Sequence, residues 1–358
     1  MANTGDAALA AQTYERLAAF SLQDLEAVRL LLRGASVIDW HRLAFESLTE
    51  VDRFLRVQEL DPGNEDHLER LERIRTESVE FATRNFSFRI PDDVAYDTPV
   101  RELFLLASKR GKRQTYACVI LKLMHVLHHL HGRELLFKLP IAEQEIFHLV
   151  EEKVVRVVDE IRAAGHSISE FAWSRKERDS MILKLLAKRA NIAAQLYDKL
   201  RFRVHLRAAA DIVPLLRELH HRLLPFNYVI PGESINEIVP FRALVESGPL
   251  ARLAPGLQSG VDLEENERKA MRNEFSGPGY KSVSFVVDLP LRIDKLLARQ
   301  PHLVEEYGHV VFVLTEFQVL DVQSAYENEH GENSHDAYKV RQKERVKARL
   351  TRGLEPFK

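Results

Sequence analysis

The hydrophobic pattern of this chain changes near Gly165, and the change limits the folds that are open to it. Before this residue, apolar side chains recur three and four positions apart, which is the period of an amphipathic α-helix. After it come short runs rich in Val, Phe and Ile that partly alternate with polar residues, as half-buried strands do. These runs lie at 199–206, 226–230, 281–291 and 309–320. We therefore predict an all-helical N-terminal domain over residues 1–165, followed by a domain that contains a β-sheet.

Helical patterns separate the predicted strands. The spacing predicts one helix from Arg175 to Ala193 and another over residues 211–224. Strands with interposed helices favour an α+β or α/β domain over residues 166–340. The polar, Gly-rich stretch from Ala243 to Gly279 is typical of a long loop, and loops of this length often carry function.

The charge balance excludes a protein that binds polyanions over its whole surface. Lys and Arg together number 51 and Asp and Glu 53, which still allows a local basic site. The segment from Lys339 to Arg352 is strongly basic and predicts a helix, so residues 341–358 form a basic C-terminal helical tail. Clustered Lys and Arg bind phosphates without sequence specificity, which makes an RNA contact through this tail one hypothesis. A solvated terminal helix is the other.

Cysteine content and apolar run length exclude further classes of protein. Cys118 is the only cysteine, which excludes a disulfide scaffold and a Cys-rich zinc or iron–sulfur site. The first residues lack the basic-then-apolar order of a signal peptide. Charged residues such as Lys122 interrupt the longest apolar runs, which are far shorter than a membrane span. We expect a cytoplasmic protein that makes no membrane contact.

A cluster of histidines, His125, His128, His129 and His131, raises a metal hypothesis, because three of these imidazoles could share one helix face. No Asp or Glu lies on the same turns to complete such a site. The flanking residues are typical of a core, so a partly buried helix with polar edges is the favoured interpretation. The sequence contains no GxxxxGK[ST] loop, no GxGxxG after a strand, and neither HExxH nor GxSxG.

Four short motifs follow one another in the second half of the chain. The first, SRKERDSMILKLL, spaces Lys176, Ser180 and Lys184 four residues apart, which predicts that they share one face of a helix. The second, YDKLRFRV, has Asp198 at the start of a predicted strand and Arg203 five residues later. Positions five apart on one continuous strand face opposite sides, so this pair needs a twist, a bulge or an Asp before the strand.

The third motif, GPGYKSVSFVV, precedes a predicted strand and contains Gly279, Tyr280 and Ser282. The fourth is TEFQVLDVQSAYENEHGENSHDAYK. Its matching positions are Glu316, Gln318, Glu329, Gly331, His335, Tyr338 and Lys339. In residue types, spacing and order, the four motifs together resemble the synthetase domain of the RelA/SpoT family.

This resemblance implies a nucleotidyltransferase fold over residues 166–340, with a mixed β-sheet flanked by helices. Enzymes of that family make the alarmone guanosine tetraphosphate or pentaphosphate, by transferring pyrophosphate from ATP to the 3′-hydroxyl of GDP or GTP. The resemblance therefore implies a Mg²⁺-dependent transferase that binds ATP and a guanine nucleotide. The sequence does not predict its oligomeric state.

The resemblance also implies roles for single residues. Asp198 and Glu316 would be the catalytic carboxylates and the Mg²⁺ ligands. Glu316 would also accept the proton of the attacking hydroxyl. Tyr280 would stack on the acceptor base. The remaining positions would bind the nucleotides: Lys176, Arg178, Ser180, Lys184, Arg203, Ser282, Gln318, His335 and Lys339.

Three positions depart from the family pattern. Ser174 and Leu320 stand where the family has arginine, and Ser284 stands where it has histidine. Arg175 or Arg178 is a candidate to replace the first arginine, and the candidates to replace the second lie in the long loop: Arg252, Lys269 and Arg272.

These departures leave two alternatives open. One is a catalytically inactive nucleotide-binding or regulatory protein that keeps the fold, and the other is a pyrophosphokinase that acts on another acceptor, such as tRNA. The family's hydrolase half uses a His-Asp metal motif in its N-terminal helices. The only His-Asp pair here is His335-Asp336, inside the fourth motif, so we expect no hydrolase activity.

Overall fold

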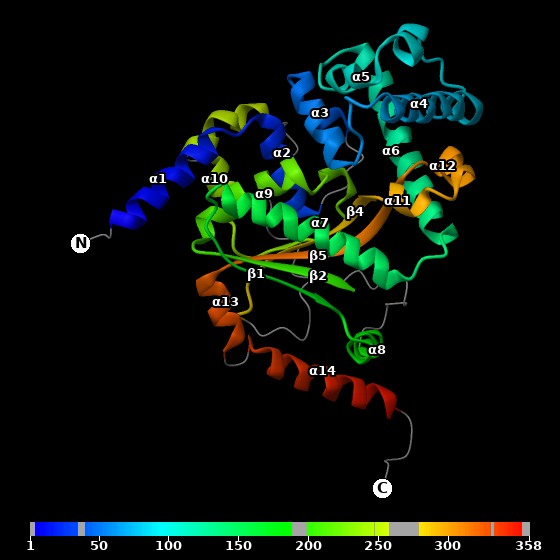
Figure 1. Ribbon diagram of the computed structural model, residues 1–358. Helices are drawn as coiled ribbons and strands as arrows, with labels where there is room; N and C mark the ends of the chain where they lie inside the picture. The colour runs from blue at the N-terminus through cyan, green and yellow to red at the C-terminus, as the bar shows by residue number, and fades with distance from the viewer. Residues whose placement is uncertain are drawn as a thin grey trace.

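The computed structural model describes residues 4–34, 40–187, 199–246, 248–257, 279–330 and 333–352. Helices precede the sheet in the chain, as predicted (Figure 1). They are α1 (Thr4–Ala18), α2 (Leu22–Arg33), α3 (Leu48–Val57), α4 (Glu65–Phe86), α5 (Val100–Ala107), α6 (Lys112–Lys138) and α7 (Glu143–Ala163). Two short turns, η1 (Trp40–Arg42) and η2 (Asp93–Asp97), connect some of them. Within the described residues, no helix is both long and apolar enough to cross a bilayer.

The ends of α2 show how local sequence sets these helices. Ser21 and Asp24 form a capping box, in which each side chain accepts a hydrogen bond from the other's backbone N–H. Gly34 ends the helix in the left-handed conformation with φ of 55°, which a residue without Cβ adopts at no steric cost. The Asp24 carboxylate, which accepts from the backbone N–H of Ser21, also binds Arg217 and His221 of α9.

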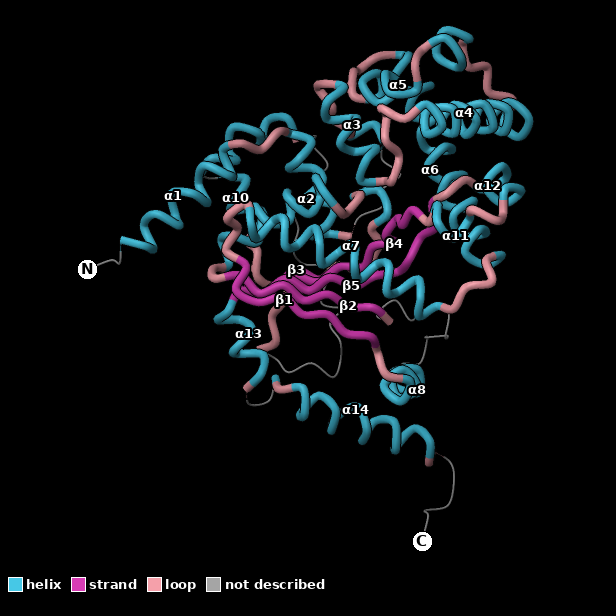
Figure 2. Tube along the Cα trace, in the orientation of Figure 1, coloured by secondary structure: helices cyan, strands magenta, loops and turns pink. Residues whose placement is uncertain are grey.

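A five-stranded mixed sheet forms the centre of the molecule, which confirms the predicted fold class (Figure 2). Its strands are β1 (Ile168–Arg175), β2 (Leu200–Leu206), β3 (Ile235–Asn236), β4 (Val283–Arg292) and β5 (Val310–Asp321). The order is β1-β2-β5-β4-β3, and only the β2–β5 pair is parallel among the described strands. The helices between and after them are α8 (Arg178–Ala187), α9 (Ile212–Arg222), α10 (Phe241–Glu246), α11 (Asp294–Leu297), α12 (Pro301–Tyr307), α13 (Val322–Glu329) and α14 (His335–Leu350). Three 3-10 turns also lie here: η4 (Ala209–Asp211), η5 (Phe226–Tyr228) and η6 (Gly248–Gly256).

Three sequence predictions of secondary structure need correction. Strand β1 was not predicted, because this edge strand is mostly exposed and lacks the Val and Ile run of a buried strand. The run 226–230, predicted as a strand, starts as the 3-10 turn η5 directly after Pro225, and only Val229 forms an isolated bridge, to Val287. The predicted loop 243–279 starts inside α10 and continues as η6, and its positions 258–278 lie outside the described residues.

The two faces of the sheet differ in chemistry. On one face the rings of Phe171, Phe202, Phe317 and Phe285 form a row across four strands, with centroid separations of 6.1, 5.4 and 5.7 Å. These rings belong to the large hydrophobic core that α2, α7 and α9 also supply. Figure 1 shows these helices on one side of the sheet and α8, α13 and α14 on the other. The second face carries polar side chains, because successive residues of a strand point to opposite sides.

The core on the apolar face combines residues from both parts of the chain. Its members run from Leu17 of α1 to Val319 of β5, so helices before residue 165 cover strands after it. A second core, with Trp40, Phe54 and Phe104, lies among α3, α5 and α6. The division of the chain near residue 165 stays a prediction.

Candidate functional site

The polar face of the sheet centres on Glu316, which lies in the middle strand β5. The register sets Arg201 of β2 directly beside Glu316, and Arg203 beside Gln318. On the other side, Ser284 of β4 pairs with Gln318. Residues that face each other across neighbouring strands share one face, so these five side chains gather on the same surface.

Hydrogen bonds and an ion pair connect the five side chains. Arg201 Nε donates to Oε2 of Glu316 at 2.9 Å, and Nη2 forms an ion pair with the same oxygen, also at 2.9 Å. Gln318 Nε2 donates to Oε1 of Glu316 at 3.0 Å, and Ser284 Oγ donates to the same oxygen at 3.3 Å. Arg203 in turn donates to Oε1 of Gln318 from Nε and Nη2, at 3.3 and 3.2 Å. Glu316 is only 8% exposed, and a buried carboxylate needs this kind of compensation.

Local sequence explains how the cluster forms. In β2 the run Arg-Phe-Arg-Val alternates, so Phe202 and Val204 enter the core while Arg201 and Arg203 point to the opposite face. Arg203 was predicted from the second motif, and Arg201 was not. The signal that could have found Arg201 is its position two residues before Arg203, which puts both guanidinium groups on one face of the strand.

Tyr280 and Ser282 lie at the start of β4, next to the cluster. Burial raises the pKa of Tyr280, and the charges of Arg203 and Arg201 oppose that rise, so the phenol lies within electrostatic range of both guanidinium groups. Ser282 is buried. Asn328 of α13 fixes this segment, because its side chain accepts from the backbone N–H of Lys281 at 3.0 Å and donates to the carbonyl of Lys281 at 2.7 Å.

Helices α8 and α14 bring another pair of predicted site residues together. Lys339 Nζ donates to Ser180 Oγ at 2.9 Å. Ala187 of α8 and Val346 of α14 are buried against each other, with Leu183, Leu186 and Tyr338 around them. The two helices therefore hold the first and fourth motifs side by side. Arg178 is exposed on the first turn of α8, and Lys184 is half-buried on its last turn.

The expectation that Lys176 shares a helix face with Ser180 and Lys184 is wrong. Helix α8 begins at Arg178, and Lys176 lies between β1 and this helix. Its backbone N–H donates to the carbonyl of Lys199 at 2.9 Å, which continues the pairing of β1 with β2 and keeps the residue extended. Ser180 and Lys184 are both on α8, four residues apart.

Some predicted residues lie outside what the structure describes. Asp198 and Gly331 are not among the described residues. His335 is the first residue of α14, and its side chain is likewise outside the description. The roles given to Asp198 and His335 stay predictions.

The structure also shows the surroundings of the positions that depart from the family pattern. Ser174 is the neighbour of Arg201 in the register of β1 with β2. Arg175 does not replace an arginine there, since its guanidinium binds both carboxylate oxygens of Glu151 on α7, at 2.6 and 2.7 Å. Leu320 is buried on β5. Arg252 of η6 donates to the carbonyl of Ala18 at 2.8 Å, at the junction of α1 and α2. Lys269 and Arg272 lie outside the described residues.

Comparison with known proteins finds solved structures that are similar to this chain. Neither a family model nor a curated relative matches the sequence. The chain is similar to small alarmone synthetase 2 from Bacillus subtilis, with 12% identity, a TM-score of 0.33, and coverage of 59% of this chain and 90% of that one. It is also similar to small alarmone synthetase 1 from Bacillus subtilis bound to its product pppGpp, with 17% identity, a TM-score of 0.30, and coverage of 56% and 82%. A GTP pyrophosphokinase family protein from Streptococcus pneumoniae is similar at 14% identity and a TM-score of 0.31, over 58% and 83% of the two chains.

Three histidines of α6, His125, His129 and His131, lie within hydrogen-bond distance of side chains from other parts of the chain. His129 Nε2 lies 2.6 Å from Asp288 Oδ2 on β4, a partner that sequence spacing did not reveal. His125 Nδ1 lies 3.1 Å from Asn227 Nδ2, and its ring stacks on Tyr228 with centroids 4.7 Å apart. Burial lowers the pKa of His125 and His128 to about 3, so both imidazoles are neutral at pH 7. These contacts fit a partly buried helix with polar edges.

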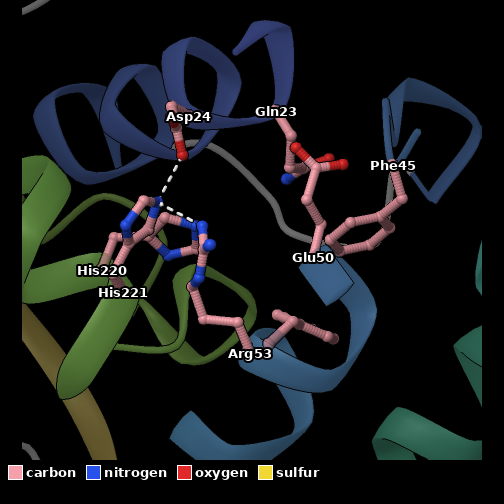
Figure 3. A pocket seen from close by; sticks show the side chains of 8 residues that line it. Gln23, Asp24, Phe45, Glu50, Arg53, His220 and His221 are labelled. Carbon is pink, nitrogen blue, oxygen red and sulfur yellow. Dashed lines mark hydrogen bonds and ion pairs between the residues drawn. The ribbon is translucent and has the colours of Figure 1, made fainter. Parts of the chain in front are cut away.

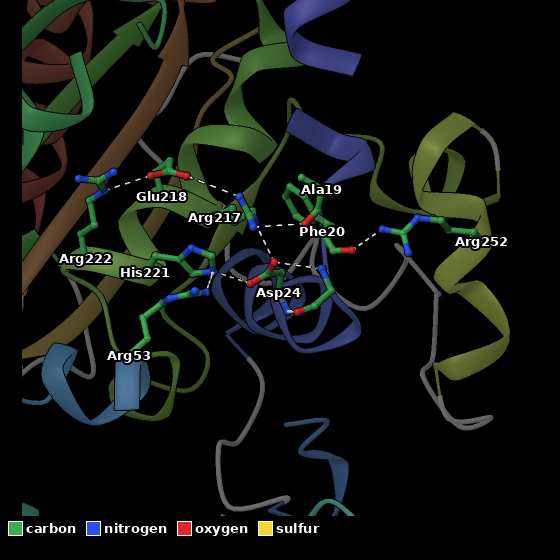
Figure 4. Close-up of polar contacts among 10 residues, drawn as sticks. Ala19, Phe20, Asp24, Arg53, Arg217, Glu218, His221, Arg222 and Arg252 are labelled. Atoms are coloured by element: carbon green, nitrogen blue, oxygen red, sulfur yellow. Dashed lines mark hydrogen bonds and ion pairs between the residues drawn. The ribbon is translucent and has the colours of Figure 1, made fainter. Parts of the chain in front are cut away.

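Among the described residues, three other side chains come close enough to share a metal ion: Asp24, His220 and His221. They line a small pocket between α2, α3 and α9 (Figure 3). Two arginines already contact Asp24 and His221, as Figure 4 shows. Arg217 Nε donates to Asp24 Oδ2 at 2.7 Å, and Arg53 Nη1 lies 3.3 Å from His221 Nε2, which is itself 2.5 Å from Asp24 Oδ1. Two guanidinium groups at the ligand atoms repel a further cation, so this cluster connects helices rather than binding a metal.

Proposed function

We propose that this protein is a pyrophosphokinase that transfers pyrophosphate from ATP to the 3′-hydroxyl of a guanine nucleotide in the cytoplasm. The observation that supports this best is the polar cluster on the open sheet face. There, the buried carboxylate of Glu316 binds Arg201 of β2, together with Ser284 and Gln318 of the third and fourth motifs. Lys339 and Ser180, from the fourth and first motifs, meet nearby on α14 and α8.

The reaction sets requirements that these residues can meet. The 3′-oxygen of the acceptor forms a bond to the β-phosphorus of ATP, and the bond from that phosphorus to the bridging oxygen of the α-phosphate breaks. AMP leaves with the electron pair of that bond, and the hydroxyl proton passes to a carboxylate oxygen of Glu316. Arg203, Lys184 and Lys339 supply positive charge for the phosphate oxygens, since such transfers are catalysed mainly by positioning and charge stabilisation.

A magnesium ion fits this set of donors. When bound, Mg²⁺ spreads the charge that develops on the phosphates. It needs one or two carboxylates and takes its other ligands from water and phosphate. Glu316 offers one carboxylate, and a bound cation would take the place of the Arg201 guanidinium as its positive partner. Asp198 would supply the second.

A second acceptor class, the 3′ end of an RNA such as tRNA, is favoured by one observation. Helix α14 carries Arg341, Lys343, Arg345, Lys347 and Arg349. It lies beside α8 and on the same side of the sheet as Glu316. An RNA whose phosphate backbone lay along α14 would have its 3′ end close to the proposed site.

The test is a transfer assay with Mg²⁺ and ATP labelled at the γ-phosphate. GDP, GTP, ATP and bulk tRNA are offered in turn as acceptors. We expect label on a guanine nucleotide, loss of that label in Glu316→Gln, and no loss in Glu305→Gln, which removes an exposed carboxylate on α12. Label on tRNA alone would assign the second acceptor class. Nucleotide binding without transfer to any acceptor would instead support an inactive regulatory protein.

A further inference from the structure

Three phenylalanines form a row at the C-terminal end of α4, away from the polar sheet face. The ring centroids of Phe81 and Phe86 lie 6.0 Å apart, and those of Phe86 and Phe88 lie 5.5 Å apart. Phe86 is 56% exposed and Phe88 45%. None of the three rings belongs to a hydrophobic core of the described residues or packs against one. Single exposed apolar residues are common, but a contiguous group of exposed rings indicates a binding surface.

The backbone at this end of α4 holds the two exposed rings together. Ser87 ends the helix in the left-handed conformation with φ of 54°, which is unfavourable for a residue that has a Cβ. Its backbone N–H donates to the carbonyl of Thr83 at 3.0 Å. The next N–H, that of Phe88, donates to the carbonyl of Ala82 at 3.4 Å. Phe86 and Phe88 are therefore fixed on either side of a tight turn, with their ring planes at 33° to each other.

Two arginines flank the exposed rings and bring positive charge to the same turn. Arg84 lies on the last turn of α4, and Arg89 lies just beyond it. Both are exposed, and within the described residues neither guanidinium has a hydrogen-bond or ion-pair partner. Residues 81–91 include no Asp or Glu, and Asp93 is already paired with Arg113. The turn therefore carries two positive charges that a bound anion can neutralise.

We propose that this turn, residues 81–89, binds single-stranded nucleic acid, and we call it the α4 tip. Unpaired bases stack on aromatic rings whatever their sequence, and arginines beside the rings bind the phosphates that link the bases. A purely apolar partner would leave both guanidinium groups without an anion. Figure 1 shows α4 and the basic helix α14 at opposite ends of the molecule, so the α4 tip is distinct from the surface considered for an RNA acceptor. Binding at the α4 tip does not depend on the proposed function.

Fluorescence anisotropy with two labelled strands of about ten nucleotides tests this on the whole chain. One strand is oligothymidylate, which contains no guanine for the proposed site to bind, and the other has the same backbone with abasic sugars. We expect wild type to bind oligothymidylate about tenfold more tightly than the abasic strand, and Phe86→Ala/Phe88→Ala to lose this preference. Phe137→Ala is the matched control, because it removes an exposed ring that also lies beside an arginine, Arg133 of α6.

Two further variants separate the contributions of the rings and the charges. Phe86→Leu/Phe88→Leu keeps apolar side chains but has no planar ring, so it should lose the preference for oligothymidylate as well. It also takes the place of the alanine variant if circular dichroism shows that the latter does not fold. Arg84→Gln/Arg89→Gln should keep the preference but reduce the slope of log affinity against log salt concentration by about 1.4, since each phosphate contact on a single strand contributes about 0.7.

Several results would overturn the proposal. Wild type could bind the two strands equally, which would show that the bases make no contact. Phe137→Ala could cause the same loss as the variants of the α4 tip, or the salt slope could stay unchanged in Arg84→Gln/Arg89→Gln. Binding of neither strand by wild type would also overturn it, and would favour an apolar protein segment as the occupant of this surface.

Discussion

Arginine binds several buried carboxylates among the described residues, and two of them, Asp24 and Glu316, lie in different surroundings. Asp24 is enclosed by α2, α3 and α9, and its oxygens bind Arg217, His221 and the backbone N–H of Ser21. Burial by itself would raise the pKa of Asp24, but the hydrogen bonds and charges of His221 and Arg217 lower it well below its ordinary value. Asp24 therefore stabilises the contact between helices, whereas Glu316 lies on a sheet face that carries further polar and charged groups.

We predict that Asp24→Asn lowers the free energy of unfolding by about 3–5 kcal/mol, because it removes the buried charge that binds both Arg217 and His221 in the helix junction. Urea denaturation at pH 7 measures the loss. Asp61→Asn is the control, since the Arg56–Asp61 pair is largely exposed and should contribute less than about 1 kcal/mol.

The pH dependence of the same variant gives a second readout. A folded-state pKa below the unfolded one means that Asp24 stabilises the fold above the unfolded pKa, and that this contribution is lost as the pH falls further. Wild type and Asp24→Asn should therefore converge in stability below about pH 4. A constant difference between them down to pH 3 would contradict the assignment.

Much of the site could be predicted at the level of residues. Glu316 and Gln318 are two residues apart, and this spacing on a strand already puts them on one face. Spacing within β2 puts Arg201 on the same face as Arg203, but it does not show that Arg201 binds Glu316, because that contact depends on which strand lies beside β2. The link from His129 to Asp288 was missed for the same reason, since it joins a helix to a strand far along the chain.

At the level of elements, α6 buries a histidine that has to stay neutral. Burial, with a smaller effect of the charge of Arg70, lowers the pKa of His128 to about 3. The ring packs edge-on against Phe312 of β5, and its Nε2 has no hydrogen-bond partner. In the unfolded chain His128 takes up a proton near pH 6.5, whereas in the folded chain it stays neutral. The free energy of unfolding therefore falls as the pH drops below 6.5.

We predict that His128→Leu removes this sensitivity. Between pH 7 and pH 5 the wild type should lose about 2 kcal/mol of unfolding free energy through this one residue, a loss that the variant avoids. Chemical denaturation at both pH values gives the difference. His148→Leu, an exposed site on α7, is the control and should keep the wild-type pH dependence. The same pH dependence in His128→Leu and wild type would show that His128 is not the source.

Element prediction succeeded for the helices before residue 165 and for the buried strands, and it failed at edges and turns. Strand β2 partly alternates, and β4 and β5 are buried along almost their whole length, as their apolar runs indicate. β1 lacks such a run because it is an exposed edge strand with one neighbour. The run after Pro225 has strand-like residues, but it becomes the turn η5, whose Phe226 stacks on Phe54 of the helical core. Tertiary contacts, rather than the strand propensity of its residues, determined the conformation of this segment.

For the whole molecule, the shared core predicts that the two parts of the chain depend on each other. Val150, Val154 and Val158 of α7 are buried in the same cluster as Phe202 and Phe317. We predict that a fragment of residues 166–352 alone exposes this apolar face and is aggregated or unfolded. Circular dichroism and size-exclusion chromatography, with full-length protein as the control, test this. A soluble fragment with a cooperative melting transition would show that the sheet does not need the N-terminal helices.

The parallel pairing of β2 with β5 has a consequence for protein synthesis. Arg201 and Glu316 touch although 115 positions separate them in sequence, and β5, which carries Glu316, is the last of the described strands to be made. A ribosome that is still translating the codons before Val310 carries a chain that has Arg201 but not the carboxylate that it binds. Long-range pairing of this kind is slow to form, and here it waits until β5 has been translated. Unfinished chains therefore cannot assemble the proposed site, and cells that abort translation early would not release active fragments.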